Sequence, residues 1–211
     1  MVYRLMNISG TSLMLKFCNL KKMPYIGSVM KKILVAIDVQ NDFITGALRN
    51  TEAIKKVPNI VKKIREFDGD AIIYTMDTHG ENYMETKEGE KLPVVHCVKG
   101  TDGWKIQSEV NSELISAKLR GVKVFEIQKP TFGALNIVDD IKSVVGDEGD
   151  FDIEFVGFCT DICVVSNVLI TKAAFYERAN VAVDSMCCAG VTKESHAAAL
   201  ATMTSCQINV L

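Results

Sequence analysis

The chain of 211 residues is 48% hydrophobic and 24% charged, so it can bury one sizeable core and a single domain is expected. Its formal net charge is -2, and no basic stripe is interleaved with aromatic residues, which argues against nucleic acid as a partner. Seven cysteines without a CxxC pair indicate a reducing, cytoplasmic compartment, and no apolar run approaches the about 18 residues that a membrane span needs.

The N-terminal segment differs from the rest of the chain in charge. Residues 1–32 carry a charge of +6 and no acid, which leaves residues 33–211 at -8. One interpretation is a basic targeting or membrane-surface arm, although interrupted apolar residues and the lack of a small-residue cleavage site disfavour a signal peptide. We instead interpret the segment as an extended start before a domain at residues 30–211, and expect residues 1–29 to be poorly ordered.

From residue 33 the chain alternates strand and helix patterns. A continuous apolar run at 33–37 ends at Asp38, and another at 71–76 ends at Asp77. Such runs are typical of strands that are covered on both faces. Further strands are predicted at residues 122–127, 153–156, 181–183 and 208–210.

Helical patterns lie between these strands, at residues 58–67, 134–145, 161–176 and 192–204. Pro58 suits the first turn of its helix, and Thr160 and Thr192 suit N-caps. This alternation predicts a three-layer α/β/α domain with a mostly parallel, Rossmann-like sheet of about six strands. Residues 78–101 break the pattern as a long polar stretch, and a loop of that length in a compact domain is usually functional.

Ionisable or nucleophilic side chains mark the ends of four consecutive strands. Asp38 and Asp77 end the first two, Lys129 follows the third, and Cys159 and Cys163 follow the fourth. Taken singly, each is explained as a turn residue, a solvated lysine or a packing cysteine. Together they indicate a site, because the carboxyl ends of parallel strands meet at one edge of the sheet, where ligands bind.

The two cysteines differ in their expected surroundings. Cys163 lies in the first turn of the helix that starts near Thr160, where free N–H groups and the helix dipole favour a thiolate. A nearby Lys129 would lower the thiol pKa further. Cys159 precedes this turn, so we expect its backbone, and not its sulfur, to contribute.

Three segments of the chain resemble the signature regions of the isochorismatase-like cysteine hydrolases. They are the run DVQNDF at residues 38–43, the run KPTF at 129–132 and the run GFCTDICV at 157–164. The resemblance extends from about residue 31 to the C-terminus, and the three runs together are specific. It implies Cys163 as nucleophile, Asp38 as base, Lys129 as supporting cation, and an oxyanion hole from the N–H groups of Cys159 and Cys163. It also implies a cis peptide bond between Phe158 and Cys159.

Histidines and acids around the polar stretch predict a metal site. Asp77 and His79 stand two residues apart at a strand end, so both can point to one side, and His96 lies toward the other end of the stretch. These segments resemble the nicotinamidase branch of the family, which binds a divalent metal through Asp, His, His and a further His or Glu. The nitrogen and oxygen set suits zinc first, with manganese or iron as alternatives. The fourth ligand here would be a glutamate: Glu88 is favoured, Glu85 is second, and Glu81 is also open.

The resemblance implies a nicotinamidase, which hydrolyses nicotinamide to nicotinate and ammonia through a thioester on Cys163. Phe43 and Trp104 would hold the substrate ring, and His196 is expected to be structural. A homo-oligomer is also implied. Two alternatives stay open: another amidase or carbamoyl hydrolase of the superfamily, and a non-catalytic α/β binding module. Hydrolysis of isochorismate is disfavoured, because family members with that activity need no nucleophilic cysteine.

Overall fold

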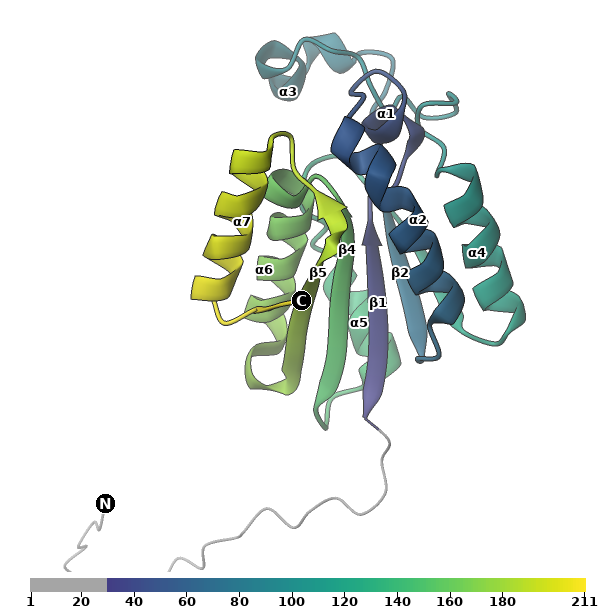
Figure 1. Ribbon diagram of the computed structural model, residues 1–211, viewed down its shortest axis with the longest axis vertical. Helices are drawn as coiled ribbons and strands as arrows, with labels where there is room; N and C mark the ends of the chain where they lie inside the picture. Colours follow the sequence, from purple (N-terminus) through teal and green to yellow (C-terminus); the bar gives the residue numbers. More distant parts are fainter. Residues whose placement is uncertain (1–29) are drawn as a thin grey trace, which may run out of the picture.

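A computed structural model of the chain describes residues 30–211, so the expectation for residues 1–29 lies outside the described residues. One parallel sheet runs through the described part, with helices on both of its faces (Figure 1). Within residues 30–211, no helix combines the length and the apolar character that crossing a membrane requires.

The sheet has six strands in the order β3-β2-β1-β4-β5-β6, and all neighbours pair in parallel. The strands are β1 (Lys31–Ile37), β2 (Ala71–Asp77), β3 (Lys123–Lys129), β4 (Phe151–Phe158), β5 (Ala179–Ala189) and β6 (Asn209–Val210). The chain winds outward from β1 to β3 and then returns to β4 on the other side of β1. Winding therefore reverses between β1 and β4, which is where open parallel sheets bind ligands.

Helices cover each face of the sheet and bury a separate hydrophobic core. On one face lie α2 (Thr51–Glu66) and α4 (Ser108–Leu119), and on the other α5 (Ile137–Val145), α6 (Val165–Phe175) and α7 (Lys193–Ser205). Leu34 and Ala36 of β1 pack toward the first group, while Ile33 and Val35 pack toward the second. The uninterrupted apolar run is thus required by burial on both sides, and the predicted three-layer fold is confirmed.

The start of α2 differs from the prediction. The helix begins at Thr51, and Pro58 lies inside it instead of in its first turn. Asn50 supplies the N-cap, because its side chain accepts hydrogen bonds from the N–H groups of Glu52 and Ala53. Burial of the apolar face of α2 on the sheet outweighs the loss of one helical hydrogen bond at the proline.

Helix α4 was not predicted from the sequence. Only Val110, Leu114 and Ala117 of its twelve residues are buried, so the apolar stripe is too narrow to stand out. Gln107 caps this helix by accepting a hydrogen bond from the N–H of Val110 at 2.9 Å.

The helix after β4 begins with an irregular turn. Residues Thr160–Val164 form a single π-helical turn, and α6 follows directly. Thr160 is not the N-cap that was predicted, because Cys159 occupies that position and the hydroxyl of Thr160 lies 2.8 Å from Nδ1 of the half-buried His196. The predicted cap of α7 is confirmed, since Thr192 and Ser195 form a capping box.

Candidate active site

Asp38 follows β1 and is held tightly in the interior. Its side chain is fully buried, and its backbone has a left-handed conformation with φ of 48°. The hydroxyl of Thr75 donates a hydrogen bond to Oδ1 of Asp38 at 2.6 Å, and Nζ of Lys129 lies 2.7 Å from Oδ2. Burial raises the pKa of Asp38 above its ordinary value, although Lys129 opposes this effect. A carboxylate with a raised pKa is suited to accept and return a proton.

Lys129 ends β3 and is buried to 99% among anionic groups. Besides Asp38, its ammonium group lies 3.5 Å from Sγ of Cys163 and 3.5 Å from Oδ1 of Asp77, and it donates to the carbonyl of Thr131. Burial alone would lower the pKa of Lys129, but the neighbouring anionic groups raise it. The side chain therefore stays a cation between two carboxylates.

Cys163 lies in the π-helical turn with 5% of its surface exposed. Its thiol does not have the lowered pKa that the sequence suggested. Burial, together with the nearby charge of Asp38, raises the pKa of Cys163 well above its ordinary value, and Lys129 only partly offsets this. The thiol therefore keeps its proton until a base removes it, and Asp38 is the base beside it.

Cys159 stands at the start of the same turn and is partly exposed. Burial and the charge of Asp161 raise the pKa of its thiol to about 12, so a raised pKa does not distinguish it from Cys163. The contact of Cys163 with the cation of Lys129 at 3.5 Å does. The peptide bond between Phe158 and Cys159 is cis, as the resemblance implied.

Asn167 holds the turn in place, and sequence reasoning missed it. The side chain is fully buried in α6 and donates hydrogen bonds to the carbonyls of Cys163 at 2.7 Å and Phe132 at 3.1 Å. Its Oδ1 accepts from the N–H of Ala134 at 2.9 Å. Asn167 thus ties the segment after Lys129 to the helix that carries Cys163; an asparagine four residues after the cysteine is the only sequence signal for it.

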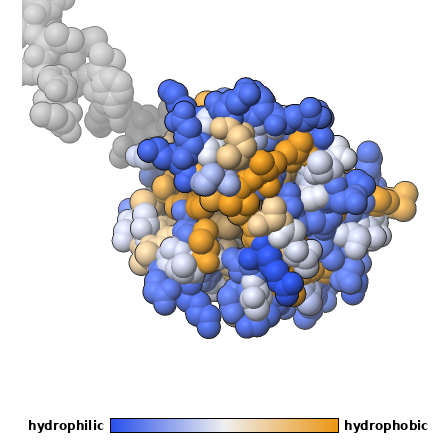
Figure 2. Space-filling view, turned by 90° about the horizontal axis from the view of Figure 1, so that it is seen from above, coloured by the Kyte–Doolittle hydropathy of each residue, from blue (hydrophilic) through white to orange (hydrophobic). Residues whose placement is uncertain are grey.

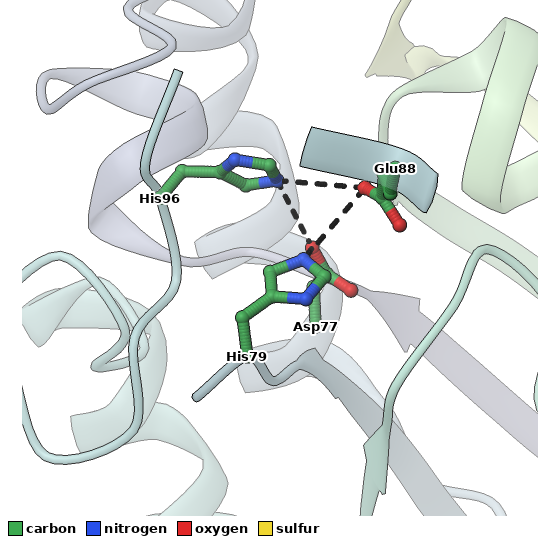
Figure 3. Close-up of side chains that lie close together, drawn as sticks. All are labelled: Asp77, His79, Glu88 and His96. Atoms are coloured by element: carbon green, nitrogen blue, oxygen red, sulfur yellow. Dashed lines mark hydrogen bonds and ion pairs between the residues drawn. The ribbon is translucent and has the colours of Figure 1, made fainter. Parts of the chain in front are cut away.

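Four side chains gather beside this group in an arrangement suited to a metal ion. One donor atom from each of Asp77, His79, Glu88 and His96 lies within 4.8 Å of the others, and the side chains point toward one another (Figure 3). They come from the end of β2, the segment after it, α3 (Lys87–Lys91) and the loop beyond α3. Among the three candidate glutamates, the structure brings Glu88 to this group, and neither Glu81 nor Glu85 belongs to it.

The distances within the group fit a small divalent cation. Oδ2 of Asp77 lies 3.0 Å from Nε2 of His79 and 3.4 Å from Nε2 of His96, and Oε1 of Glu88 lies 3.7 Å and 3.9 Å from the same two nitrogens. A tetrahedral zinc with bonds of about 2.1 Å spaces its donors about 3.4 Å apart. Nδ1 of His96 lies 2.8 Å from the carbonyl of Val94, which can only accept, so that nitrogen carries the proton and Nε2 is left for a metal.

Cys163 and the four candidate ligands line one large cleft of about 1400 Å³. Phe43 also lines it, with its ring 5.9 Å from that of His96 in an edge-on arrangement. Figure 2 views this end of the molecule, where hydrophobic side chains form a band with hydrophilic residues around them. Exposed Phe132, which was not predicted as a site residue, lines the opening.

Trp104 is not among the residues that line the cleft. Its indole N–H donates to the hydroxyl of Thr78 at 2.9 Å, and its carbonyl accepts from Gln40. The ring packs against the core on the α2 and α4 side of the sheet. The predicted contact of Trp104 with a substrate therefore has no support in this arrangement.

Several solved structures share the fold of this chain. No curated protein sequence matches the chain. Among solved structures, it resembles a nicotinamidase/pyrazinamidase from Bacillus subtilis with a TM-score of 0.72 and 23% identity, covering 86% of this chain and 99% of that one. It also resembles the pyrazinamidase of Pyrococcus horikoshii in complex with zinc, with a TM-score of 0.67 and 23% identity, covering 86% of this chain and 98% of that one. A third similar structure is a protein from L. infantum in complex with nicotinate, with a TM-score of 0.70 and 15% identity, covering 86% of this chain and 92% of that one.

At these identities the solved structures establish the fold. The family rests on a sequence model, the isochorismatase domain, which matches residues 32–211 and so includes every strand end described above. The chain therefore belongs to the isochorismatase family.

Proposed function

We propose that the protein is a metal-dependent cysteine amidohydrolase, and specifically a nicotinamidase that converts nicotinamide and water into nicotinate and ammonia. The observation that carries this proposal is that Lys129 lies 3.5 Å from both Cys163 and Asp77, which joins a nucleophile to a candidate metal centre in one cleft. The solved structures that this chain resembles include a nicotinamidase/pyrazinamidase, a pyrazinamidase in complex with zinc and a protein in complex with nicotinate, which supports the choice of substrate.

Asp77, His79, Glu88 and His96 would hold the metal, for which we propose zinc. Imidazole nitrogens and carboxylate oxygens are donors that zinc binds, and manganese and iron accept them as well. When bound, the ion would supply a Lewis acid that takes the pyridine nitrogen of the substrate as a further donor, because zinc in catalytic sites can expand beyond four ligands. Phe43, which lines the cleft beside His96, would pack against the substrate ring.

The first chemical step uses the protonated thiol of Cys163 and the carboxylate of Asp38. Asp38 accepts the proton from Sγ as the sulfur attacks the carbon of the carboxamide. The carbonyl oxygen of the substrate becomes an oxyanion, which the backbone N–H groups of Cys159 and Cys163 would bind. Negative charge passes between the sulfur of Cys163 and the carboxylate of Asp38 during this step. The buried cation of Lys129 contacts both groups and stabilises that charge in the interior.

The second step releases ammonia and restores the enzyme. Asp38 returns the proton to the amide nitrogen as the C–N bond breaks, which leaves a thioester on Cys163. A water molecule then attacks the thioester while Asp38 takes one of its protons. The C–S bond breaks, and the thiolate of Cys163 regains its proton from Asp38. The nicotinic acid that leaves gives its remaining proton to the released ammonia and becomes nicotinate.

Ammonia release from nicotinamide tests the proposal directly. We expect turnover by the zinc-loaded wild type, none by Cys163→Ala, and loss after chelation that added zinc reverses. Cys206→Ala is a matched control, because this cysteine is free and exposed and does not line the cleft. Absence of ammonia release by the zinc-loaded wild type would exclude nicotinamide as the substrate.

A second candidate is hydrolysis of a larger amide or a carbamoyl compound by the same residues. The cleft of about 1400 Å³ exceeds the about 300–1,000 Å³ of typical small-molecule sites. Turnover of an amide panel in which nicotinamide is a poor substrate would favour this candidate. If no amide is hydrolysed and Cys163 resists alkylation, the non-catalytic alternative holds. The homo-oligomer and the cytoplasmic location stay predictions, for sedimentation and for localisation of a tagged chain to check.

A further inference from the structure

The run that carries Asp38 contains two more buried polar residues with no role in the chemistry above. Gln40 is fully buried and Asp42 is 8% exposed, although both follow the strand end that faces the cleft. Neither lines the cleft. Burial of an amide and of a carboxylate costs free energy unless each is bonded, so their partners indicate what they do.

Gln40 holds the backbone of Asp77 through both of its polar groups. Its Nε2 donates to the carbonyl of Asp77 at 2.9 Å, and its Oε1 accepts from the N–H of the same residue at 2.8 Å. A third hydrogen bond runs from Nε2 to the carbonyl of Trp104 at 2.8 Å. One side chain therefore binds the peptide units on both sides of the Cα of a candidate metal ligand.

Asp42 holds the segment next to His96. Its Oδ2 accepts a 2.7 Å hydrogen bond from the N–H of Cys97, and its Oδ1 accepts from the N–H of Ala47 at 2.9 Å. Cys97 is buried and has a left-handed backbone with φ of 46°, a conformation that costs free energy in a residue other than glycine. A Cβ atom at Gly103 would collide with the carboxylate of Asp42, so the neighbouring loop can approach only without a side chain there.

Cys97, which Asp42 binds, is also hydrogen-bonded to the backbone of His79. The N–H of His79 donates to the carbonyl of Cys97 at 3.0 Å, and the N–H of Lys99 donates to the carbonyl of His79 at 3.0 Å. The segments of His79 and His96 are thereby joined side by side through their backbones. Asp42 fixes one end of this pair and Gln40 fixes Asp77, so only Glu88 lacks a hold from this run.

We propose that Gln40 and Asp42 are positioning residues that pre-arrange Asp77, His79 and His96 for the metal. This inference rests on the metal site of the proposed function. It assigns two roles to the run at residues 38–43: its first aspartate serves the nucleophile, and its glutamine and second aspartate serve the metal ligands. Partners of metal ligands of this kind usually contribute about 10–100-fold to metal affinity.

The dissociation constant for Zn²⁺, measured by competition with a chromophoric chelator, tests this assignment. We expect Gln40→Met and Asp42→Asn to bind Zn²⁺ about 10–100-fold more weakly than wild type. Asn41→Ala is the matched control: it removes a hydrogen bond of 2.8 Å to the carbonyl of Asp102 from the same turn but touches no candidate ligand, and its affinity should not change. The absorption spectrum of bound Co²⁺ should change in the two positioning variants and stay unchanged in the control.

A second readout separates positioning from general damage. In metal-free protein, iodoacetamide should alkylate Cys163 at the wild-type rate in both variants, because their contacts lie on the metal side. If Asp42→Asn does not fold, Gly103→Ala displaces the same carboxylate with Asp42 intact, and should weaken Zn²⁺ binding likewise. Wild-type affinity in these variants, or weakened Zn²⁺ binding accompanied by an equal loss of alkylation, overturns the inference. A wild type that binds no divalent metal overturns the proposed metal site with it, whereas metal binding without amide turnover contradicts only the proposed function.

Discussion

Lys129 and Asp77 join the two halves of the candidate site, because Nζ of Lys129 lies 3.5 Å from Oδ1 of Asp77 while Oδ2 of that carboxylate faces the histidines. Lys129 also lies 2.7 Å from Asp38, so one buried cation neutralises two buried carboxylates. A change at this lysine should therefore affect both halves at once.

Replacing Lys129 with methionine should abolish amide turnover and destabilise the fold. The substitution keeps the apolar stem but leaves two buried carboxylates without their cation, which costs about 3–5 kcal/mol in comparable cases. Denaturant unfolding measures the free energy of unfolding of both proteins. Lys55→Met, which removes an exposed lysine paired with Glu52, is the control and should change little. Equal stability of Lys129→Met and wild type would contradict the role given to the cation.

Asp38→Asn should lower the pKa of Cys163 and still abolish turnover. Burial is the main cause of the raised thiol pKa, but the charge of Asp38 adds to it, so its removal favours the thiolate. The asparagine cannot accept a proton, and general base catalysis contributes about 10²–10⁴-fold to the rate. Ultraviolet absorbance of the thiolate against pH checks the first part, and ammonia release checks the second. A thiolate that forms only at higher pH than in wild type would show that Asp38 does not oppose it.

Glu88→Gln should reduce the stabilisation that zinc gives to the folded protein. Zinc at 100 times its dissociation constant adds about 2.7 kcal/mol to the free energy of unfolding, and a weaker site gains less at the same concentration. Thermal unfolding with and without zinc measures the difference. Glu85→Gln is the matched control, since this exposed residue lies close by in sequence but outside the group of four. The reverse pattern in the two variants would transfer the fourth ligand to Glu85.

Asn167→Ala should lower stability and slow turnover without touching any reacting atom. The change leaves the buried N–H of Ala134 without its partner, at a cost of about 1–3 kcal/mol, and removes the hydrogen bonds to the carbonyls of Cys163 and Phe132. Asn59→Ala removes an exposed hydrogen bond to the carbonyl of Met186 and should cost far less. Denaturant unfolding and kcat are the two measurements. Unchanged values of both would show that the π-helical turn keeps its position without Asn167.

Strand ends were the most predictable part of the molecule. The apolar runs before Asp38 and Asp77 require burial on both faces, and a parallel sheet then brings their carboxyl ends together. Glu88 was favoured among three glutamates, but no local pattern distinguishes it. Its position depends on the short helix α3, which folds back over the strand ends.

Other features depend on packing that no local pattern contains. The pKa of Cys163 was expected to fall because a helix start and a lysine lie near it, yet the core around the turn removes water and reverses the direction. Trp104 was expected to hold the substrate ring because of its residue type. Its position depends instead on a distant segment, since Gln40 donates a hydrogen bond to its carbonyl. Burial is a property of the assembled layers, so a local sequence window underestimates it.

The order of the strands determines at what stage of folding the thiol of Cys163 gains its base and its cation. Asp38, Lys129 and Cys163 follow or end three different strands, with β1 at the centre of the sheet and β3 at one edge. A nascent chain that has not yet emerged beyond β4 holds the base and the cation but no nucleophile, and an unfolded chain holds three unrelated side chains. The chemistry is thus latent during synthesis and arises only when β1, β3 and β4 have come together, so a catalytic assay reports native assembly as well as turnover.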